Sequence, residues 1–364
     1  MSLEAVREAF VSRFDEAPEI VTRAPGRVNL IGEHTDAHEG FVFPAAIDRF
    51  VWLAASRTNG EVDLHSLEFD TNDWTVYPKG VAWAFAERDI HVPNLRGVVT
   101  SDVPIGAGIS SSAALEMAFA VAWNELEGLG LPPIELAILG QRCENGFVGV
   151  QCGLMDQMAS ACGLAGSAMF FDTLTKEVIY RALPEEVVIV VADTTKSREL
   201  TSSKYNERRA DCEEAARALG VRALRHATLG ELEDAADLMS DVAFRRARHV
   251  ITEMRRCLDF SKALESRNFS KIGDLMRASH ASLRDDYEAS CLELDAMAEA
   301  CNAAPGCIGA RMTGAGFGGA CVALVLRSSL SLFLEEASRT YFEATGLTGR
   351  LMGCEAAHGA QRIA

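Results

Sequence analysis

Three consecutive hydroxyls, Ser110–Ser112, follow Gly106 and Gly108 in the segment Val103–Leu115. Glycine lets a backbone turn sharply and approach an anion closely. The residues that follow, as far as about Glu127, are strong helix formers, so the hydroxyls should gather at a helix N-terminus, where unpaired N–H groups and the helix dipole favour negative charge. The spacing therefore predicts a phosphate site, with an ordinary serine-capped helix as the alternative.

A second group of polar residues, Glu33, His34 and Asp36, comes directly after the apolar run Val28–Ile31. Three interpretations are open. The turn is a solvated charged loop, a metal site, or a polyol site, because carboxylates accept hydrogen bonds from sugar hydroxyls while imidazole groups donate to them. The metal site would consist of His34, Asp36, His38 and Glu39, which lack the helical i, i+4 spacing that aligns two imidazoles.

An aspartate, Asp156, lies in the otherwise apolar segment Gly153–Gln157. An unpaired charge in such surroundings is costly, so Asp156 needs a cationic or hydrogen-bonding partner, for which Arg27 is the candidate. The residue is either a carboxylate kept ionised to accept a proton, or a helix cap or structural ion pair.

The glycines Gly314, Gly316 and Gly319 match the dinucleotide pattern Gly-x-Gly-x-x-Gly in form only. That fingerprint requires a helix after the glycines, whereas the run that follows, as far as Leu326, is typical of a strand. The segment Arg311–Ala320 therefore predicts a strand, a turn and a second strand, forming either a plain hairpin or a loop that closes over a ligand. The common phosphate loop that ends in Gly-Lys-Ser/Thr does not occur in the sequence.

With 364 residues, the chain is longer than one core normally supports, and we expect two closely packed domains. Its 35 basic and 52 acidic residues give a net charge of −17, which argues against nucleic acid and anionic membranes as partners. The ten cysteines include no Cys-x-x-Cys pair, no secretory leader is recognisable, and no apolar run reaches the ~20 residues of a membrane span. We therefore expect a cytoplasmic protein with reduced thiols.

Hydrophobic periodicity predicts strands mixed with helices in the first half and a mainly helical stretch in the second. Helices are expected over Leu3–Phe14, from Ala113 to about Glu127, from Pro133 to Asn145, over most of Tyr205–Asn302, and once more before Leu351. Strands are expected over Val28–Ile31, Phe50–Ala55, Leu95–Thr100, Glu185–Asp193, Cys307–Met312 and Gly319–Leu326, and near Leu351. This mixture indicates an α+β fold rather than a regular alternation of strand and helix.

Five segments, in this order and at these separations, resemble the motifs of the GHMP small-molecule kinases, and the first narrows the resemblance to the galactokinase family. They are Gly26–Asp36, Pro104–Ala114, Cys152–Gln157, Ser279–Tyr287 and Arg311–Gly319. The resemblance implies the two-domain GHMP architecture, with an N-terminal ribosomal-protein-S5-domain-2-like domain over residues 1–181 and a ferredoxin-like C-terminal domain over 182–364. Sugar and ATP would bind in the cleft between the domains of what we expect to be a monomer.

The resemblance also assigns roles to individual residues. Asp156 matches the family's catalytic aspartate, and Arg27 matches the cation beside it. The sugar-binding positions are matched by Glu33, His34, Asp36, Gly153 and Tyr205. The phosphate loop is matched by Gly106, Ala107, Gly108, Ile109, Ser110, Ser111 and Ser112, the lining of the adenine pocket by Trp74 and Tyr77, and the positions linked to magnesium by Ser112 and Glu144.

The implied activity is transfer of the ATP γ-phosphate, with Mg²⁺, to the anomeric hydroxyl of galactose, which gives galactose 1-phosphate. In that reaction Asp156 would take or orient the hydroxyl proton, and the helix that begins near Ser110 would stabilise the phosphate charge.

One segment departs from the family pattern: Ala37–Glu39 reads Ala-His-Glu, where galactokinases generally carry Tyr-Asn or similar after the aspartate. This leaves the sugar open, with N-acetylgalactosamine and arabinose as alternatives. A uronic acid is disfavoured because Glu33 would repel its carboxylate. A non-catalytic sensor of sugar and ATP is the other alternative, and it is disfavoured by the uninterrupted serines and by the presence of both Asp156 and Glu144.

Overall fold

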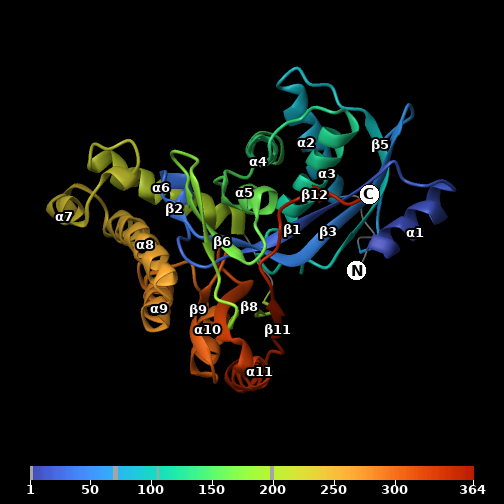
Figure 1. Ribbon diagram of the computed structural model, residues 1–364. Helices are drawn as coiled ribbons and strands as arrows, with labels where there is room; N and C mark the ends of the chain where they lie inside the picture. Colours follow the sequence, from blue (N-terminus) through green and yellow to red (C-terminus); the bar gives the residue numbers. More distant parts are fainter. Residues whose placement is uncertain (1–2, 69–72, 105, 197–200) are drawn as a thin grey trace.

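A five-stranded sheet forms the centre of the N-terminal half of the molecule (Figure 1). The computed structural model describes residues 3–68, 73–104, 106–196 and 201–364. The strand order is β12-β1-β3-β5-β4, with β4 parallel to β5 and the other neighbours antiparallel. The strands are β1 (Ile20–Asn29), β3 (Pro44–Thr58), β4 (Asp63–Ser66), β5 (Asn94–Ser101) and β12 (Gln361–Arg362).

Both faces of this sheet pack against helices, because successive side chains of a strand point to opposite faces. Val21 and Trp52 form a small core with α1 (Leu3–Phe14). Their neighbours Ile20 and Leu53 belong to the main core on the other face. The helices on that face are α2 (Val76–Ala86), α3 (Ser111–Leu126), α4 (Pro133–Arg142) and α5 (Met155–Cys162) (Figure 1). Helices α3 and α5 thereby lie against β1, where Arg27 bonds the Ile109 carbonyl just before α3 and Asp156 in the first turn of α5.

A second, four-stranded antiparallel sheet forms the C-terminal half, in the order β11-β8-β10-β9. Its elements are β8 (Val187–Asp193), β9 (Cys307–Met312), β10 (Ala320–Leu326) and β11 (Arg350–Cys354), with α10 (Leu292–Ala303) before β9 and α11 (Leu330–Thr345) before β11. This is the ferredoxin-like succession of strand, helix, two strands, helix and strand. Every residue of β8 is buried, as its unbroken apolar run predicts.

Between β8 and α10 the chain forms a helical arm beside both sheets (Figure 1). It consists of α6 (Thr201–Ala218), α7 (Leu229–Asp234), α8 (Asp241–Glu265) and α9 (Phe269–Asp285). A small sheet of β2 (Phe41–Val42), β6 (Ser167–Asp172) and β7 (Val178–Ala182) packs against α8 of this arm. The short 3-10 helices are η1 (Asp36–His38), η2 (Asp73–Thr75), η4 (Leu224–His226), η5 (Ala236–Leu238) and η6 (Arg327–Ser329).

The predicted elements are present, but the bounds of three differ clearly. The strand predicted over Phe50–Ala55 is the middle of β3, which runs from Pro44 to Thr58. The strand predicted over Val28–Ile31 is the end of β1, which begins at Ile20 and carries a register shift between Pro25 and Arg27; proline and glycine inside the strand mask it in the sequence. The helix predicted to reach Asn145 ends as α4 at Arg142 and continues as a π-helix, η3 (Cys143–Val148).

The α+β, two-domain GHMP prediction is confirmed, and β9 and β10 form the predicted pair joined by the glycine turn. The boundary between residues 181 and 182 stays a prediction. Several elements were not predicted, among them α2, the small sheet of β2, β6 and β7, and β12, which pairs with β1 and returns the last residues to the first sheet. Among the described residues, no helix has both the length and the apolar character needed to span a bilayer.

Candidate active site

A cavity of about 360 Å³ opens where β1, the N-termini of α3 and α5, and the glycine turn between β9 and β10 meet. It brings together most of the residues that the sequence singles out for chemistry. Its lining consists of Arg27, Glu33, His34, Asp36, Tyr77, Ser112, Glu144, Val150, Cys152, Gly153, Met155, Asp156, Tyr205, Gly314 and Ala315.

The serine loop is joined to the catalytic candidate by a hydrogen bond. Ser110 precedes α3 in a left-handed conformation, with φ 60° and ψ 51°, which is uncommon outside glycine, and Gly108 before it has φ 80°. The Ser110 hydroxyl makes no cap to its own helix and donates instead to Asp156 Oδ2 at 2.5 Å. The alternative of an ordinary serine cap is therefore wrong.

Arg27 and Asp156 are the ion pair that burial predicts. The Arg27 Nη2 and Nε atoms lie 2.6 and 2.7 Å from Asp156 Oδ1, and Nη1 donates to the carbonyl of Gly108 at 2.7 Å. The arginine side chain is 4% exposed and the aspartate side chain 30%. Arg27 is thus fixed in a buried part of the pocket wall, while Asp156 is more accessible from the pocket.

Asp36 lies directly against Gly153, which explains why that position has no side chain. A Cβ at Gly153 would come within 2.0 Å of Asp36 Oδ2. Burial, together with the carboxylates of Asp156 and Glu33, raises the pKa of Asp36 to about 6. Two of the predicted sugar-binding positions therefore touch, although more than a hundred residues separate them in the chain.

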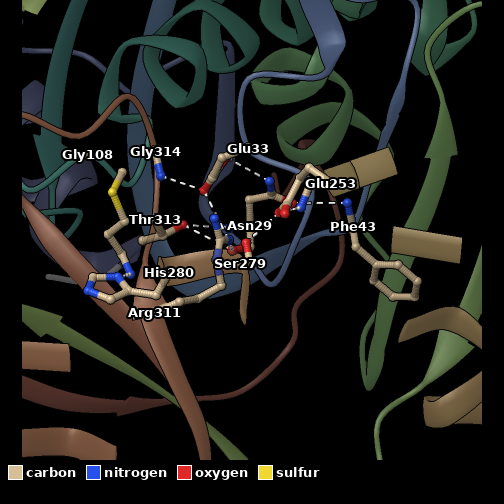
Figure 2. Close-up of polar contacts among 12 residues, drawn as sticks. Asn29, Glu33, Phe43, Gly108, Glu253, Ser279, His280, Arg311, Thr313 and Gly314 are labelled. Atoms are coloured by element: carbon tan, nitrogen blue, oxygen red, sulfur yellow. Dashed lines mark hydrogen bonds and ion pairs between the residues drawn. The ribbon is translucent and has the colours of Figure 1, made fainter. Parts of the chain in front are cut away.

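Glu33 is buried and joins the predicted sugar-binding turn, Glu33–Asp36, to the glycine turn of the C-terminal half (Figure 2). Its Oε2 accepts a hydrogen bond from Asn29 Nδ2 at 2.8 Å, and its Oε1 accepts one from the Gly314 N–H at 2.7 Å. Arg311 forms an ion pair with Oε1 at 3.5 Å. The predicted loop that could close over a ligand is therefore bonded to a residue of the pocket.

Helix α8 holds the backbone of the same turn on both sides. Glu253 Oε1 accepts the Gly32 N–H at 2.9 Å, and the imidazole Nε2 of His249 lies 3.2 Å from the carbonyl of Glu33. The Ser279 hydroxyl of α9 donates to the same Glu253 oxygen at 2.5 Å (Figure 2). These contacts cross from the C-terminal helices to the N-terminal strand.

His34 lies between two tyrosine rings. Its ring centroid is 4.4 Å from that of Tyr287 and 5.6 Å from that of Tyr205. Burial, with nearby His249, lowers the pKa of His34 well below its usual value, so the imidazole is neutral. Its Nε2 atom is buried without a hydrogen-bond partner among the described residues, which leaves it available to a ligand.

Ser112 and Glu144 meet at the opposite side of the pocket. The Ser112 hydroxyl donates to Glu144 Oε1 at 2.9 Å. Burial raises the pKa of Glu144, and Asp156 raises it further. The π-helix η3 places this carboxylate beside α3, as the predicted pairing of these two residues requires.

An apolar cavity of about 430 Å³ adjoins the first, since both are lined by Tyr77 and Ser112. Trp74 and Leu115 contribute to its walls. An apolar, partly aromatic chamber suits a flat base such as adenine. In the predicted phosphate loop, by contrast, Ala107 and Ile109 are buried in the core, so only their backbone could take part in binding.

The unusual segment Ala37–Glu39 does not contribute to the lining of the first cavity. His38 is buried, and Glu39 Oε2 lies 3.0 Å from both Arg222 Nη2 and His226 Nε2. The Glu39 carboxylate is thus paired with Arg222 and His226, away from His34, which argues against the metal site considered for this turn. The Glu39 side chain faces away from the pocket.

Several residues of the site were not predicted: Asn29, His249, Glu253, Tyr287 and, as a partner of Glu33, Arg311. For Tyr287 a signal was present, because the segment Ser279–Tyr287 was recognised as a motif without a role. The structure gives it one, since Ser279 bonds Glu253 and Tyr287 stacks on His34.

Comparison with known proteins agrees with this geometry. Three family models match: the galactokinase galactose-binding signature over residues 8–57, the GHMP kinases N terminal domain over 76–164, and GHMP kinases C terminal over 260–343. The galactokinase of Roseiflexus sp. (strain RS-1) is 42% identical over 98% of this chain and 96% of its own length. The chain belongs to the galactokinase family. The galactokinase of Chloroflexus aurantiacus is similar at 41% identity, with 98% of this chain and 97% of the relative covered.

Solved structures place this galactokinase family member in the same fold. The crystal structure of Lactococcus lactis galactokinase complexed with galactose superposes with a TM-score of 0.94 at 34% identity, covering 99% of this chain and 100% of that one. The L. major mevalonate kinase, in complex with R-mevalonate, shares the fold at a TM-score of 0.66 and 18% identity, over 94% of this chain and 98% of the other. The prediction of a galactokinase-type GHMP kinase is thereby confirmed.

Proposed function

We propose that this protein transfers the γ-phosphate of ATP to the anomeric hydroxyl of galactose, with the sugar in the 360 Å³ cavity and the nucleotide in the adjoining apolar one. The observation that carries the proposal is the direct bonding of the phosphate loop to the catalytic pair. Ser110 bonds Asp156, and Arg27 bonds both Asp156 and the Gly108 carbonyl. A phosphate held by the loop would therefore lie next to the carboxylate that handles the hydroxyl proton.

In this mechanism Asp156 accepts the proton of the anomeric hydroxyl or orients it toward phosphorus. The hydroxyl oxygen attacks the γ-phosphorus, the bond to the bridging oxygen breaks, and ADP leaves with the electron pair. Arg27 and the N–H groups at the start of α3 stabilise the negative charge on the transferring phosphoryl group.

We propose Ser112 and Glu144 as the residues that hold Mg²⁺. A hydroxyl and a carboxylate are the hard oxygen ligands that Mg²⁺ prefers, and Mg²⁺ commonly uses one or two protein groups together with phosphate and water. Burial raises the pKa of Glu144, and Asp156 raises it further, so a cation bound beside this carboxylate would offset the cost of its charge. When bound, Mg²⁺ would neutralise part of the triphosphate charge.

For the sugar, we propose that Glu33, His34, Asp36 and Tyr205, with the backbone of Gly153, form the binding surface. The outward orientation of Glu39 supports galactose over a differently substituted sugar, because none of the residues Ala37–Glu39 lines the cavity. A negatively charged uronic acid would meet the carboxylates of the pocket and be repelled.

A coupled assay for ADP release tests the proposal, with saturating Mg-ATP and a panel of galactose, N-acetylgalactosamine, arabinose and a galactose-derived uronic acid. We expect galactose to give the highest kcat/KM. If only another sugar were phosphorylated, the assignment of galactose as the substrate would be wrong and the assignment as a kinase would stand. Galactose binding without ADP release would favour a non-catalytic sensor.

We also propose that the protein acts as a monomer in the cytoplasm, with a sugar and ATP as its small-molecule ligands. The ten unpaired cysteines support a reducing compartment. Light scattering of the purified protein at several concentrations tests the oligomeric state.

A further inference from the structure

The turn that carries Asp36 is held on its outer side by a group of polar and charged residues that no motif of the sequence marks. We call it the outer anchor. It consists of Glu39, Asp172, Arg222, Arg225 and His226. It lies between η1, the end of β6 and η4, outside the lining of the sugar cavity.

Arg225 is the centre of the outer anchor. Its Nη1 and Nη2 atoms donate to the two oxygens of Asp172, each at 2.7 Å, and Nη1 also donates to the backbone carbonyl of Glu39 at 2.6 Å. The guanidinium carbon lies 4.4 Å from the centre of the Phe41 ring. The planar fork of arginine meets all three partners at once, which lysine cannot do.

The partners of Arg225 are themselves fixed. Asp172 accepts the N–H groups of Leu174 and Thr175 at 3.0 and 3.2 Å, so the turn after β6 is rigid. The next residue, Thr173, donates its hydroxyl to the Gly40 carbonyl at 2.9 Å. The anchor therefore connects a rigid turn to the two residues that end the sugar-binding turn.

The position that the anchor holds is conformationally strained. Glu39 has φ 60°, in the left-handed region that a residue with a side chain seldom adopts. Such a conformation persists when surrounding contacts over-determine it, and here both the carbonyl and the carboxylate of Glu39 are bonded. Three residues earlier, Asp36 presses on Gly153 with no room to shift toward it.

From these contacts we infer that Arg225 is a positioning residue for sugar binding: it fixes the path of residues 36–40 and thereby the place of the Asp36 carboxylate. The inference rests on the proposed function, in which Asp36 binds the sugar. It also gives the unusual Ala37–Glu39 segment a role. Glu39 binds Arg222 and His226 on the outer side of the turn. The turn lacks the aromatic residue that is common at this place in the family.

The test compares Arg225→Ala with Arg327→Ala. Arg327 is a matched control, because it forms a similar fork on Glu355, at 2.6 and 3.0 Å, and also donates to a backbone carbonyl, that of Glu185, far along the C-terminal sheet from the turn. For each protein the galactose Kd without nucleotide, the KM values for galactose and ATP, kcat and the unfolding temperature are measured.

We expect Arg225→Ala to raise the galactose Kd and KM about tenfold, with the KM for ATP unchanged, because a charge-assisted contact that fixes the turn is lost. Arg225→Lys should show an intermediate rise of about threefold, since the charge stays and the fork is lost. Arg327→Ala should lower the unfolding temperature without changing either KM.

An unchanged galactose Kd in Arg225→Ala overturns the inference, as does an equal rise in the ATP and galactose constants, or an equal rise in Arg327→Ala. If Arg225→Ala does not fold, Arg225→Lys decides by the same comparison. A failure of the proposed function is distinguishable, because wild-type protein would then release no ADP with galactose; the comparison is in that case made with the sugar that binds.

Discussion

Asp156 is the residue at which binding and chemistry can be separated. Its two oxygens are engaged by Arg27 and Ser110, so Asp156→Asn keeps the size of the group and removes its charge. We expect kcat to fall by about 10²-fold or more, because a neutral amide cannot accept the hydroxyl proton, while galactose binding changes little. Steady-state kinetics and calorimetric titration with galactose measure the two effects. Near-normal turnover in this variant would remove Asp156 from the base role.

Asp36 should make sugar binding sensitive to mild acid. With a pKa raised to about 6 by burial and by Asp156, the carboxylate is mostly ionised at neutral pH and loses one of its acceptor oxygens on protonation. The galactose Kd should therefore rise about tenfold from about pH 7 to about pH 5. For stability the sign is opposite: this group favours the folded state most below its unfolded pKa, and that contribution is lost as the pH rises through about 6.

Calorimetric titration with galactose across this pH range checks the prediction, with Asp36→Asn as the control. That variant should bind weakly at every pH and show a much flatter pH dependence. A wild-type Kd that stays constant between about pH 5 and about pH 7 contradicts the assignment of the titration to Asp36.

The residues of the pocket could be predicted where polar types stand close together in the sequence, as in the serine loop and the turn from Glu33 to Asp36. Glu253 could not. It acts on the Gly32 N–H from 221 residues away, and no local spacing reveals such a contact. The conformation of Ser110 could not be predicted either, since a serine before a helix is normally a cap.

At the scale of the elements, α8 and α9 act as a clamp on β1 and its turn. Glu253 is fully buried, and its pKa is lowered to about 2; burial alone would raise it, and Arg256 and His249 outweigh burial. Its ionised form therefore stabilises the folded state above the unfolded pKa, and this contribution is lost as the pH falls through about 2. The Ser279 hydroxyl helps to hold that charge.

Ser279→Ala should consequently lower the free energy of unfolding by ~1–3 kcal/mol at neutral pH, because a buried carboxylate loses a donor. It should also raise the galactose KM, since Glu253 bonds the backbone next to Glu33. Ser266→Ala is the control: that hydroxyl bonds the Lys262 carbonyl at the exposed end of α8 and should change neither quantity. Urea unfolding and kinetics of both variants make the comparison, and equal effects in the two would remove the clamp from the explanation.

Most elements were predictable from apolar periodicity, as with α1, β5 and the buried run of β8. The π-helix η3 was not, because the sequence over residues 143–148 continues the helical pattern of α4. This segment packs closely on α2, where Gly80 leaves room for Cys143: a Cβ at Gly80 would lie 2.4 Å from Cys143 Sγ. The packing of η3 on α2 brings together residues that are far apart in the chain, and it cannot be read from a single sequence.

On the scale of the whole molecule, the end of the chain returns to the N-terminal sheet, where β12 pairs with β1. After β11 it crosses back to the N-terminal half, where the Gly359 N–H donates to the Gly163 carbonyl at 2.8 Å and the Ala360 N–H to the Ser160 carbonyl at 2.7 Å (Figure 1). Ser160 and Gly163 lie at the end of α5, the helix of Asp156. The two-residue strand β12 gives no sequence pattern, so this return could not be predicted.

The return segment should therefore support both stability and turnover. Deleting residues 359–364 removes the bonds to α5 and the pair of bonds between Val21 and the last two residues, each at 2.8 Å. At ~1 kcal/mol for each lost hydrogen bond, the free energy of unfolding should fall by about 3 kcal/mol or more. The kcat should fall as well, because β1 and α5, which carry Arg27 and Asp156, each lose a neighbour.

Arg362→Ala keeps the main-chain pairing and removes only an exposed side chain, so it should match the wild type within ~0.5 kcal/mol. If the deletion behaves like Arg362→Ala in denaturant unfolding and in the ADP-release assay, the C-terminal segment has no part in holding the catalytic pair.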